Sequence, residues 1–191
     1  MASNPVAKVT EEQYLALDRA AEIRSEFLDG EMFAMAGASL EHLRLQQNIS
    51  SGLDLVLRGK GCEVFGSDMR VRVSHRMYVY PDVTVVCGNP MLADDRRDIL
   101  VNPTVLFEVL SPSTQTYDRA VKSQRYRTIE SLREYVVVAQ DQVLVEHYVR
   151  QNDNTWNLQD LTSLDQELKL ASIGASLTLR RIYDRIEFPA T

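Results

Sequence analysis

The sequence predicts an α/β or α+β fold in which a mixed central β-sheet is flanked by helices. Short apolar stretches with the periodicity of strands alternate along the chain with stretches whose apolar residues recur at helical spacing. The chain has 191 residues, of which 45% are hydrophobic, and this is enough for one full core. We therefore expect a single globular domain over residues 1–191, without a repeat or a linker.

The first elements are two helices separated by a hairpin. Thr10 and Gln13 have the spacing of a capping box, so a short helix is expected to begin after Thr10. The dipeptide Asp29-Gly30 tolerates the positive φ of a tight turn and indicates a hairpin within residues 24–35. From Ser39 to about Arg58 the apolar residues recur at helical spacing, which predicts a long core helix capped by Ser39.

The rest of the chain is mainly strands. Residues 115–130 are expected to form a helix, because Ser111-Pro112-Ser113-Thr114 supplies a cap and a proline that stops an earlier start. The charged run at residues 94–98 is expected to be a solvated loop. The expected strands are 62–65, 69–73, 78–87 and 104–110, a hairpin of 134–138 with 143–150, a hairpin-like piece at 156–161 and a strand near Leu168, before a last helix at about 179–186.

Composition limits the possible functions. No run approaches the roughly 18 consecutive apolar residues of a membrane span, and the N-terminus lacks the order of a secretory signal, so we expect a cytoplasmic protein. The net charge of −6 argues against coating of nucleic acid without regard to sequence, although basic residues can still cluster locally. Cys62 and Cys87 lack metal-ligand spacing and are expected to be buried free thiols.

Two acidic residues lie inside apolar strand-like stretches. Asp82 follows Pro81 in Tyr-Pro-Asp-Val-Thr-Val-Val, and Glu108 lies within Thr-Val-Leu-Phe-Glu-Val-Leu. A buried carboxylate is costly unless it is paired, hydrogen-bonded or bound to a metal. If the two strands are neighbours, the carboxylates of Asp82 and Glu108 could meet at a site for Mg²⁺ or Mn²⁺, which prefer hard oxygen ligands.

A helix after these strands adds candidate polar groups. Asp118, Lys122 and Tyr126 are spaced by four residues and lie on one face of the expected helix. That face looks either at the site or at solvent, where Asp118 and Lys122 would form an ordinary surface ion pair. Spacing alone leaves both interpretations open.

These residues together resemble the Uma-type family of restriction-endonuclease-like proteins. The resemblance rests on Pro81-Asp82-Val83, the run from Glu108 to Thr114, the Asp118, Lys122 and Tyr126 series, and Glu134 to Val138. Phe27 to Glu31 and, after Ser39, His42 match the N-terminal pattern of the family. The resemblance implies a PD-(D/E)xK nuclease-like core, that is, a mixed sheet with flanking helices and a divalent-metal site.

Carried over to this chain, the resemblance implies that Asp82, Glu108 and the main-chain carbonyl of Val109 bind Mg²⁺ or Mn²⁺. It also implies that a lysine assists the attacking water. The position two residues after Glu108 is Leu110, so Lys122 would be a relocated lysine, and Tyr126 would hydrogen-bond substrate or water. We therefore expect a metal-dependent endonuclease that hydrolyses DNA, with Asp82, Glu108, Lys122 and Tyr126 as its catalytic residues.

Two other functions are compatible with the same residues. One is a catalytically decayed nuclease-fold module that binds or regulates, and the other is a hydrolase of another phosphorylated substrate. Glu31 is a further candidate acid, and His42 either orients phosphate or packs as a surface histidine. A homodimer is expected from the resemblance, with the hairpin of residues 134–150 as a possible edge for association. His75 and His147 are expected to be structural.

Overall fold

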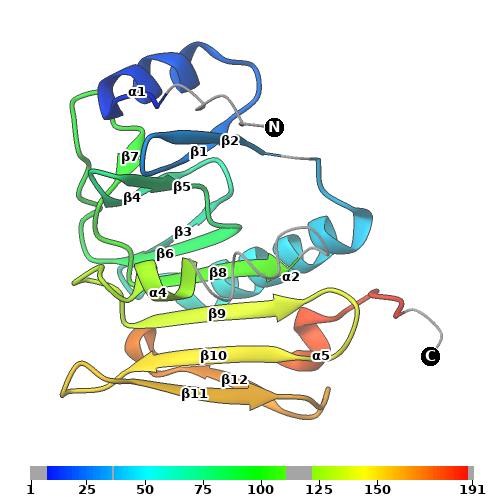
Figure 1. Ribbon diagram of the computed structural model, residues 1–191. Helices are drawn as coiled ribbons and strands as arrows, with labels where there is room; N and C mark the ends of the chain where they lie inside the picture. Colours follow the sequence, from blue (N-terminus) through cyan, green and yellow to red (C-terminus); the bar gives the residue numbers. More distant parts are fainter. Residues whose placement is uncertain (1–7, 36, 111–121, 189–191) are drawn as a thin grey trace.

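The computed structural model describes residues 8–35, 37–110 and 122–188, and its fold is a mixed α+β arrangement with helices flanking two main sheets (Figure 1). The larger sheet has the order β11-β10-β9-β8-β6-β3, and the smaller has the order β2-β1-β5-β4-β7. Each is mixed, because β8 pairs parallel with β9, and β4 pairs parallel with β7. The strands are β1 (Ser25–Leu28), β2 (Glu31–Ala34), β3 (Cys62–Gly66), β4 (Arg70–Ser74), β5 (Met77–Val79), β6 (Val83–Cys87), β7 (Ile99–Leu100), β8 (Val105–Leu110), β9 (Glu134–Ala139), β10 (Val145–Arg150), β11 (Trp156–Leu161), β12 (Glu167–Leu170) and β13 (Ala175–Thr178).

Pro81 accounts for the division into two sheets. The sequence predicted one strand over residues 78–87, but the structure contains β5 and β6, which belong to different sheets. Proline has no N–H for a ladder and a fixed φ, so it interrupts a central strand. The chain therefore changes sheets at Tyr80-Pro81-Asp82.

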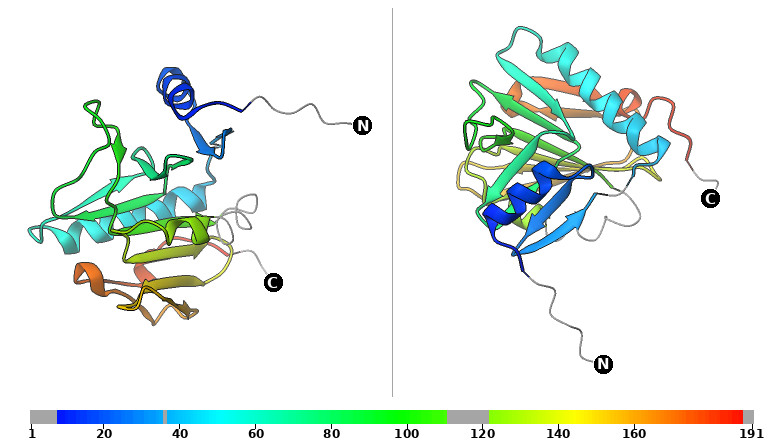
Figure 2. Two further views of the ribbon diagram at one scale, coloured as in Figure 1. Left: turned by 60° about the vertical axis from the view of Figure 1, so that its left-hand side comes forward. Right: turned by 90° about the horizontal axis from the view of Figure 1, so that it is seen from above.

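Helices cover the larger sheet on one side. The expected caps are present: Thr10 and Gln13 form a capping box at α1 (Glu11–Ala20), and the side chain of Ser39 accepts from the backbone of His42 at the start of α2 (Leu40–Leu57). Figure 2 shows α2 along one face of the larger sheet, with α1, β1 and β2 on the other side. The last helix, α5 (Leu179–Ile182), packs on the same side as α2 and is shorter than expected.

The core has three parts that follow these layers. Alternate residues of β8 separate between the two faces of the larger sheet: Val105, Phe107 and Val109 pack with α2, whereas Leu106 and Leu110 pack with the smaller sheet. A third cluster joins α1 to the smaller sheet through Tyr14, Phe27, Tyr78 and Ile99. Glu108 therefore lies on the face that the smaller sheet covers.

The segment after β8 is only partly described. The predicted cap at residues 111–114, the first part of the helix expected at 115–130 and Asp118 lie outside the described residues. Within the described residues the helix is the single turn α4 (Ser123–Tyr126), and turns follow it. Lys122 directly precedes α4.

The charged loop at residues 94–98 is largely exposed, as the sequence predicted, and two of its aspartates also form ion pairs. Arg19 on α1 binds Asp94 at 2.6 Å and Asp98 at 2.7 Å, and Asp98 also contacts the buried Arg70 at 3.1 Å. Hydrogen bonds from Arg19 lower the pKa of the Asp98 carboxyl below its ordinary value, and the charge of Arg70 acts in the same direction. The loop therefore fastens α1 to the smaller sheet.

Two further expectations are corrected. Cys62 and Cys87 form a disulfide instead of remaining free thiols, because the antiparallel register of β3 and β6 places them opposite each other. The hairpin of β9 and β10 offers no free edge, because β9 also pairs with β8, and β10 also pairs with β11. In the described ranges, no helix has the length and apolar character needed to cross a membrane.

Candidate active site

Neighbouring strands bring Asp82 next to Glu108. Val83 pairs with Phe107 in the antiparallel ladder of β6 and β8, so Asp82 lies one residue before β6, level with Glu108. The Oδ2 atom of Asp82 accepts a hydrogen bond from the backbone N–H of Val109 at 2.7 Å. Both acids are buried, with 8% of Asp82 and 4% of Glu108 exposed. The proximity that the sequence could only assume is therefore present.

Glu108 is surrounded by groups that compensate its charge. Its Oε1 atom accepts from the Tyr126 hydroxyl at 2.6 Å and lies 3.1 Å from the Lys122 ammonium. The same ammonium lies 2.8 Å from Oε1 of Glu26 on β1. The side chains of Lys122, Glu26 and Glu108 are only 7%, 12% and 5% exposed. Buried charges need such partners, because little water is present to solvate them.

Glu26 was missed from the sequence. Glu31, which the sequence offered as a further acid, is exposed on β2, whereas Glu26 contacts Lys122 and also accepts from the backbone N–H of Tyr80 at 3.3 Å. The available signal was the pattern Ser25-Glu26-Phe27, an acid inside a short strand. It does not reveal that the partner lies 96 residues further along the chain.

Helix α2 holds Asp82 from the other face of the sheet. The ring atom Nε2 of His42 lies 2.8 Å from Oδ1 of Asp82, and Gln46 donates to the backbone carbonyl of Asp82 at 3.0 Å. These two residues are four apart and share one side of the helix. The other ring atom of His42, Nδ1, is buried and has no hydrogen-bond partner among the described residues. His42 therefore contacts a candidate site residue, and its role in orienting phosphate stays a prediction.

Tyr126 is a fixed hydrogen-bond donor. It is fully buried, and its ring packs edge-on against Tyr135 with 5.1 Å between the ring centroids. Burial raises the pKa of Tyr126 well above its ordinary value, and the nearby charge of Glu108 raises it further. The hydroxyl therefore stays protonated over the physiological range and donates a hydrogen bond to Glu108.

The carboxylates of Asp82 and Glu108 offer hard oxygen ligands, which Mg²⁺ and Mn²⁺ prefer. The described residues contain no group of three or more His, Cys, Asp or Glu side chains that could hold a metal, so a backbone oxygen would have to complete a set. The carbonyl of Val109 is the candidate, because the C=O and N–H of a strand residue point to the same neighbouring strand. Extending the register of β6 and β8 places Pro81 opposite Val109, and proline has no N–H to donate to that carbonyl. Asp82, Glu108 and the Val109 carbonyl are therefore the oxygen ligands that a cation at this position would use.

Leu110 and two histidines have structural surroundings. Leu110, at the position where the wider superfamily has lysine, is 4% exposed and packs in the core with Tyr126. His147 is buried against Glu134, and His75 is exposed beside Glu11. The amine near Glu108 comes from Lys122 instead.

The fold and the acidic site define a class, the restriction-endonuclease-like proteins, and the sequence comparison agrees with it. Residues 11–180 match the family Uma2, described as "Putative restriction endonuclease", and the chain belongs to this family. Two relatives from Synechocystis sp. are the uncharacterized proteins sll1609 and slr1290. The first is 37% identical over 85% of this chain and 93% of its own, and the second is 32% identical over 97% of both.

A solved structure supports the fold. It is the crystal structure of "a putative nuclease belonging to DUF820" from Anabaena variabilis, which superposes with a TM-score of 0.73. The match covers 92% of this chain and 97% of that chain, at 17% sequence identity. The similarity concerns the fold, since the identity is low.

Proposed function

We propose that this protein is a divalent-metal-dependent endonuclease that hydrolyses phosphodiester bonds in DNA. The observation that carries the proposal is the hydrogen bond from the Val109 N–H to Asp82, which fixes one buried carboxylate beside a second, Glu108. The proposal also rests on membership of the Uma2 family. A Mg²⁺ or Mn²⁺ ion bound by Asp82, Glu108 and the carbonyl of Val109 would polarise a phosphoryl oxygen and acidify a bound water.

The remaining side chains have separate roles in this proposal. Lys122 carries a positive charge beside Glu108 and would offset the charge that develops on the phosphoryl group. Tyr126 holds the Glu108 carboxylate in one orientation through its hydroxyl. His42 and Gln46 hold Asp82 in the same way from α2. In the overall reaction a P–O bond forms from water, the P–O bond to the leaving oxygen breaks, and that oxygen takes up a proton.

Cleavage of plasmid DNA with Mn²⁺ or Mg²⁺ tests the proposal. We expect nicked and linear products from the parent protein, and a loss on the order of 100-fold or more in Asp82→Asn and in Glu108→Gln. Glu31→Gln is the matched control, because it removes an exposed carboxylate outside the site. Absence of cleavage by the parent, or equal cleavage by Asp82→Asn and the control, would refute the proposal.

A nuclease-fold binding module without catalysis is the second candidate. One observation favours it: Lys122 contacts both Glu26 and Glu108, so these carboxylates are partly compensated without a cation. Calorimetric titration with Mn²⁺ separates the two candidates. Binding by the parent that is lost in Glu108→Ala supports the nuclease, and no binding by the parent supports the module.

Hydrolysis of another phosphorylated substrate would be detected by a substrate panel under the same conditions. The homodimer is proposed on the family resemblance alone. A light-scattering mass of one chain across micromolar concentrations would exclude it.

A further inference from the structure

Arginines and aromatic rings form a group that adjoins the candidate site through Tyr126. Arg127 and Arg133 are exposed, Arg150 and Trp156 are half-buried, and Tyr148 is buried. Tyr126 contacts Glu108, packs against Tyr135, and Tyr135 stacks on Tyr148 with 5.7 Å between ring centroids. The guanidinium of Arg127, the residue after Tyr126, lies 5.2 Å from the centre of the Tyr148 ring. The contacts thus lead without a gap from the buried carboxylate to the surface.

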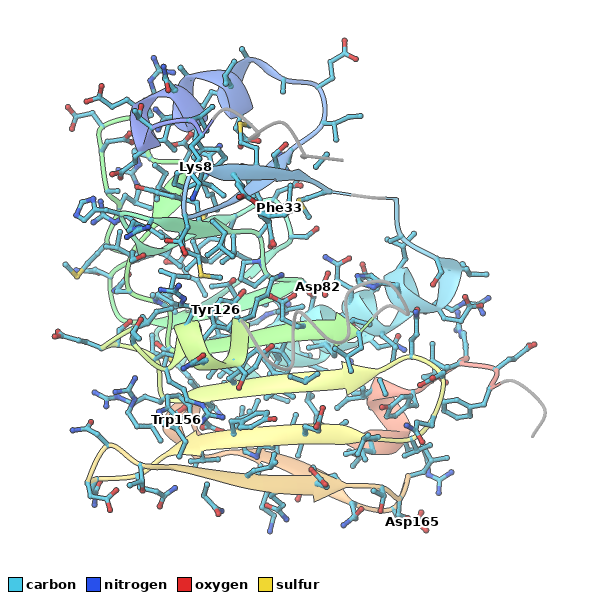
Figure 3. The ribbon with its side chains drawn as sticks, viewed as in Figure 1. Lys8, Phe33, Asp82, Tyr126, Trp156 and Asp165 are labelled. Atoms are coloured by element: carbon cyan, nitrogen blue, oxygen red, sulfur yellow. A yellow bond between two sulfur atoms is a disulfide. The ribbon has the colours of Figure 1, made fainter. Side chains whose placement is uncertain are left out.

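The group continues across β10 and β11. Arg150 donates to the backbone carbonyl of Arg127 at 2.7 Å, and its guanidinium lies 4.9 Å from the centre of the Trp156 ring. Figure 3 shows the labelled Trp156 below Tyr126 at the same end of the sheet. Arg133 belongs to the same group, because its backbone carbonyl accepts a hydrogen bond from the backbone N–H of Arg150 at 2.9 Å. Burial lowers the pKa of Arg150 and the charge of Arg133 lowers it further, while the charge of Glu130 raises it. We call Arg127, Arg133, Arg150, Tyr148 and Trp156 the arginine–aromatic face.

The charge of this face is not neutralised by ion pairs. Within the described residues, Arg127, Arg133 and Arg150 form no ion pair with a carboxylate. Elsewhere arginines usually do: Arg24 binds Asp68, and Arg180 binds Asp165. In a chain with a net charge of −6, these three neighbouring arginines form a local positive surface, which the charge of Glu130 reduces at Arg150.

Several acids lie near the face. Asp153, in the turn between β10 and β11, accepts hydrogen bonds from the backbone and hydroxyl of Thr155, and the charge of Glu130 acts on Arg150. Glu146 pairs with Asp160 and lies in the same row of the sheet as Glu108, because both Glu108 and Glu146 pair with Val137. The arginines lie beyond Tyr148 from this row, and the ring contacts of Tyr126, Tyr135 and Tyr148 connect them to the candidate site.

We propose that the arginine–aromatic face binds the phosphate backbone of duplex DNA that leads away from the cleaved bond. The path of the DNA from the cleaved bond rests on the proposed function, whereas binding of DNA by the face does not. Guanidinium groups held over aromatic rings are pre-oriented and still present N–H donors to phosphate oxygens. Such contacts position the duplex and carry no sequence information.

Fluorescence anisotropy with a short labelled DNA duplex in EDTA tests this inference, because DNA is then bound without being cut. The test variant is Arg127→Gln/Arg133→Gln, in which both residues are exposed. The control is Arg58→Gln/Arg96→Gln, which removes the same charge from two other exposed arginines. We expect the slope of log Kd against log salt to fall by about two for the test variant and to stay unchanged for the control.

Two further measurements complete the experiment. Arg127→Lys/Arg133→Lys keeps both charges and is expected to retain most of the salt slope. Equal slopes and affinities for the glutamine variant and the control would overturn the inference, as would absence of binding by the parent at low salt. Poly-glutamate that binds with the same affinity and the same dependence on Arg127 and Arg133 would overturn the assignment to DNA.

The failure of this inference is distinguishable from failure of the proposed function. A parent protein that binds DNA through Arg127 and Arg133 but cuts none with Mn²⁺ would refute the nuclease and support the binding face. A parent that cuts DNA while the glutamine variant binds normally would do the reverse.

Discussion

Replacing Lys122 by methionine tests how the carboxylates of the site are balanced. Methionine keeps an unbranched side chain of similar length and removes the charge. The ammonium of Lys122 lies 2.8 Å from Glu26 and 3.1 Å from Glu108. All three side chains are largely buried: 7% of Lys122, 12% of Glu26 and 5% of Glu108 is exposed. The substitution leaves two buried carboxylates without their shared cation.

The expected cost follows from these contacts. Removing one partner of a buried ion pair destabilises a protein by about 3–5 kcal/mol. Glu108 keeps the Tyr126 hydroxyl and Glu26 keeps the Tyr80 N–H, so we expect the lower end, about 3 kcal/mol, for Lys122→Met. This is a large fraction of the roughly 5–15 kcal/mol by which domains are stable.

Urea unfolding in EDTA near neutral pH, followed by the fluorescence of the single tryptophan, Trp156, measures this loss. Lys60→Met is the matched control, since Lys60 is an exposed lysine that donates to the carbonyl of Gly174. In medium without EDTA, Mn²⁺ at about 100 times the Kd of Lys122→Met should restore about 2.7 kcal/mol to that variant. The same Mn²⁺ concentration should stabilise the parent less, because Lys122 already compensates the two carboxylates there. An unfolding midpoint of Lys122→Met equal to that of the Lys60 control would refute the balance of charges among Lys122, Glu26 and Glu108. A stabilisation of the parent by this concentration of Mn²⁺ that equals or exceeds that of the variant would refute replacement of the ammonium by the cation.

Three further predictions concern single interactions. Tyr126→Phe removes the buried donor at 2.6 Å from Glu108 and should cost about 1–2 kcal/mol in urea unfolding; an unchanged midpoint would contradict it. Because the folded-state pKa of Asp98 is lowered by Arg19, its contribution is complete above the unfolded-state pKa of about 3.9 and is lost as the pH falls through the lower folded value. Asp98→Asn should therefore lose less stability than the parent between pH 5 and pH 2, a window set by that shift, and equal losses would exclude the linkage. The disulfide joins cysteines 25 residues apart, so reductant should destabilise the parent by about 3 kcal/mol and leave the double serine variant unaffected; a parent insensitive to reductant would show that the bond does not form.

Local sequence signals predicted the elements whose causes are local. The capping box of Thr10 and Gln13, the cap at Ser39 and the turn at Asp29-Gly30 depend on residues within a few positions of one another. Asp29 and Gly30 do adopt positive φ values of 51° and 96°. The strand β8 was also predicted from a local signal, its short run of mainly apolar residues. The structure agrees, since all six residues of β8 are buried.

The contacts that build the candidate site are less visible in the sequence. Glu26, on β1 of the smaller sheet, contacts Lys122, which directly precedes α4, and no local pattern pairs residues so far apart. The disulfide depends on the register of β3 and β6, which was not predicted. Asp82 and Glu108 could be singled out because a carboxylate in an apolar strand is costly, but their partners come from tertiary structure.

Pro81 connects the architecture to the site. If β6 continued toward its N-terminus, a ladder residue would pair with Val109 and satisfy both its N–H and its C=O. Proline stops the ladder, and the Asp82 side chain takes over the N–H of Val109. One dipeptide therefore separates the two sheets, fixes a buried carboxylate beside Glu108 and provides no N–H for the Val109 carbonyl. The first and third of these effects come from Pro81 and the second from Asp82, so Pro81-Asp82 is the part of the sequence in which fold and site depend on each other most directly.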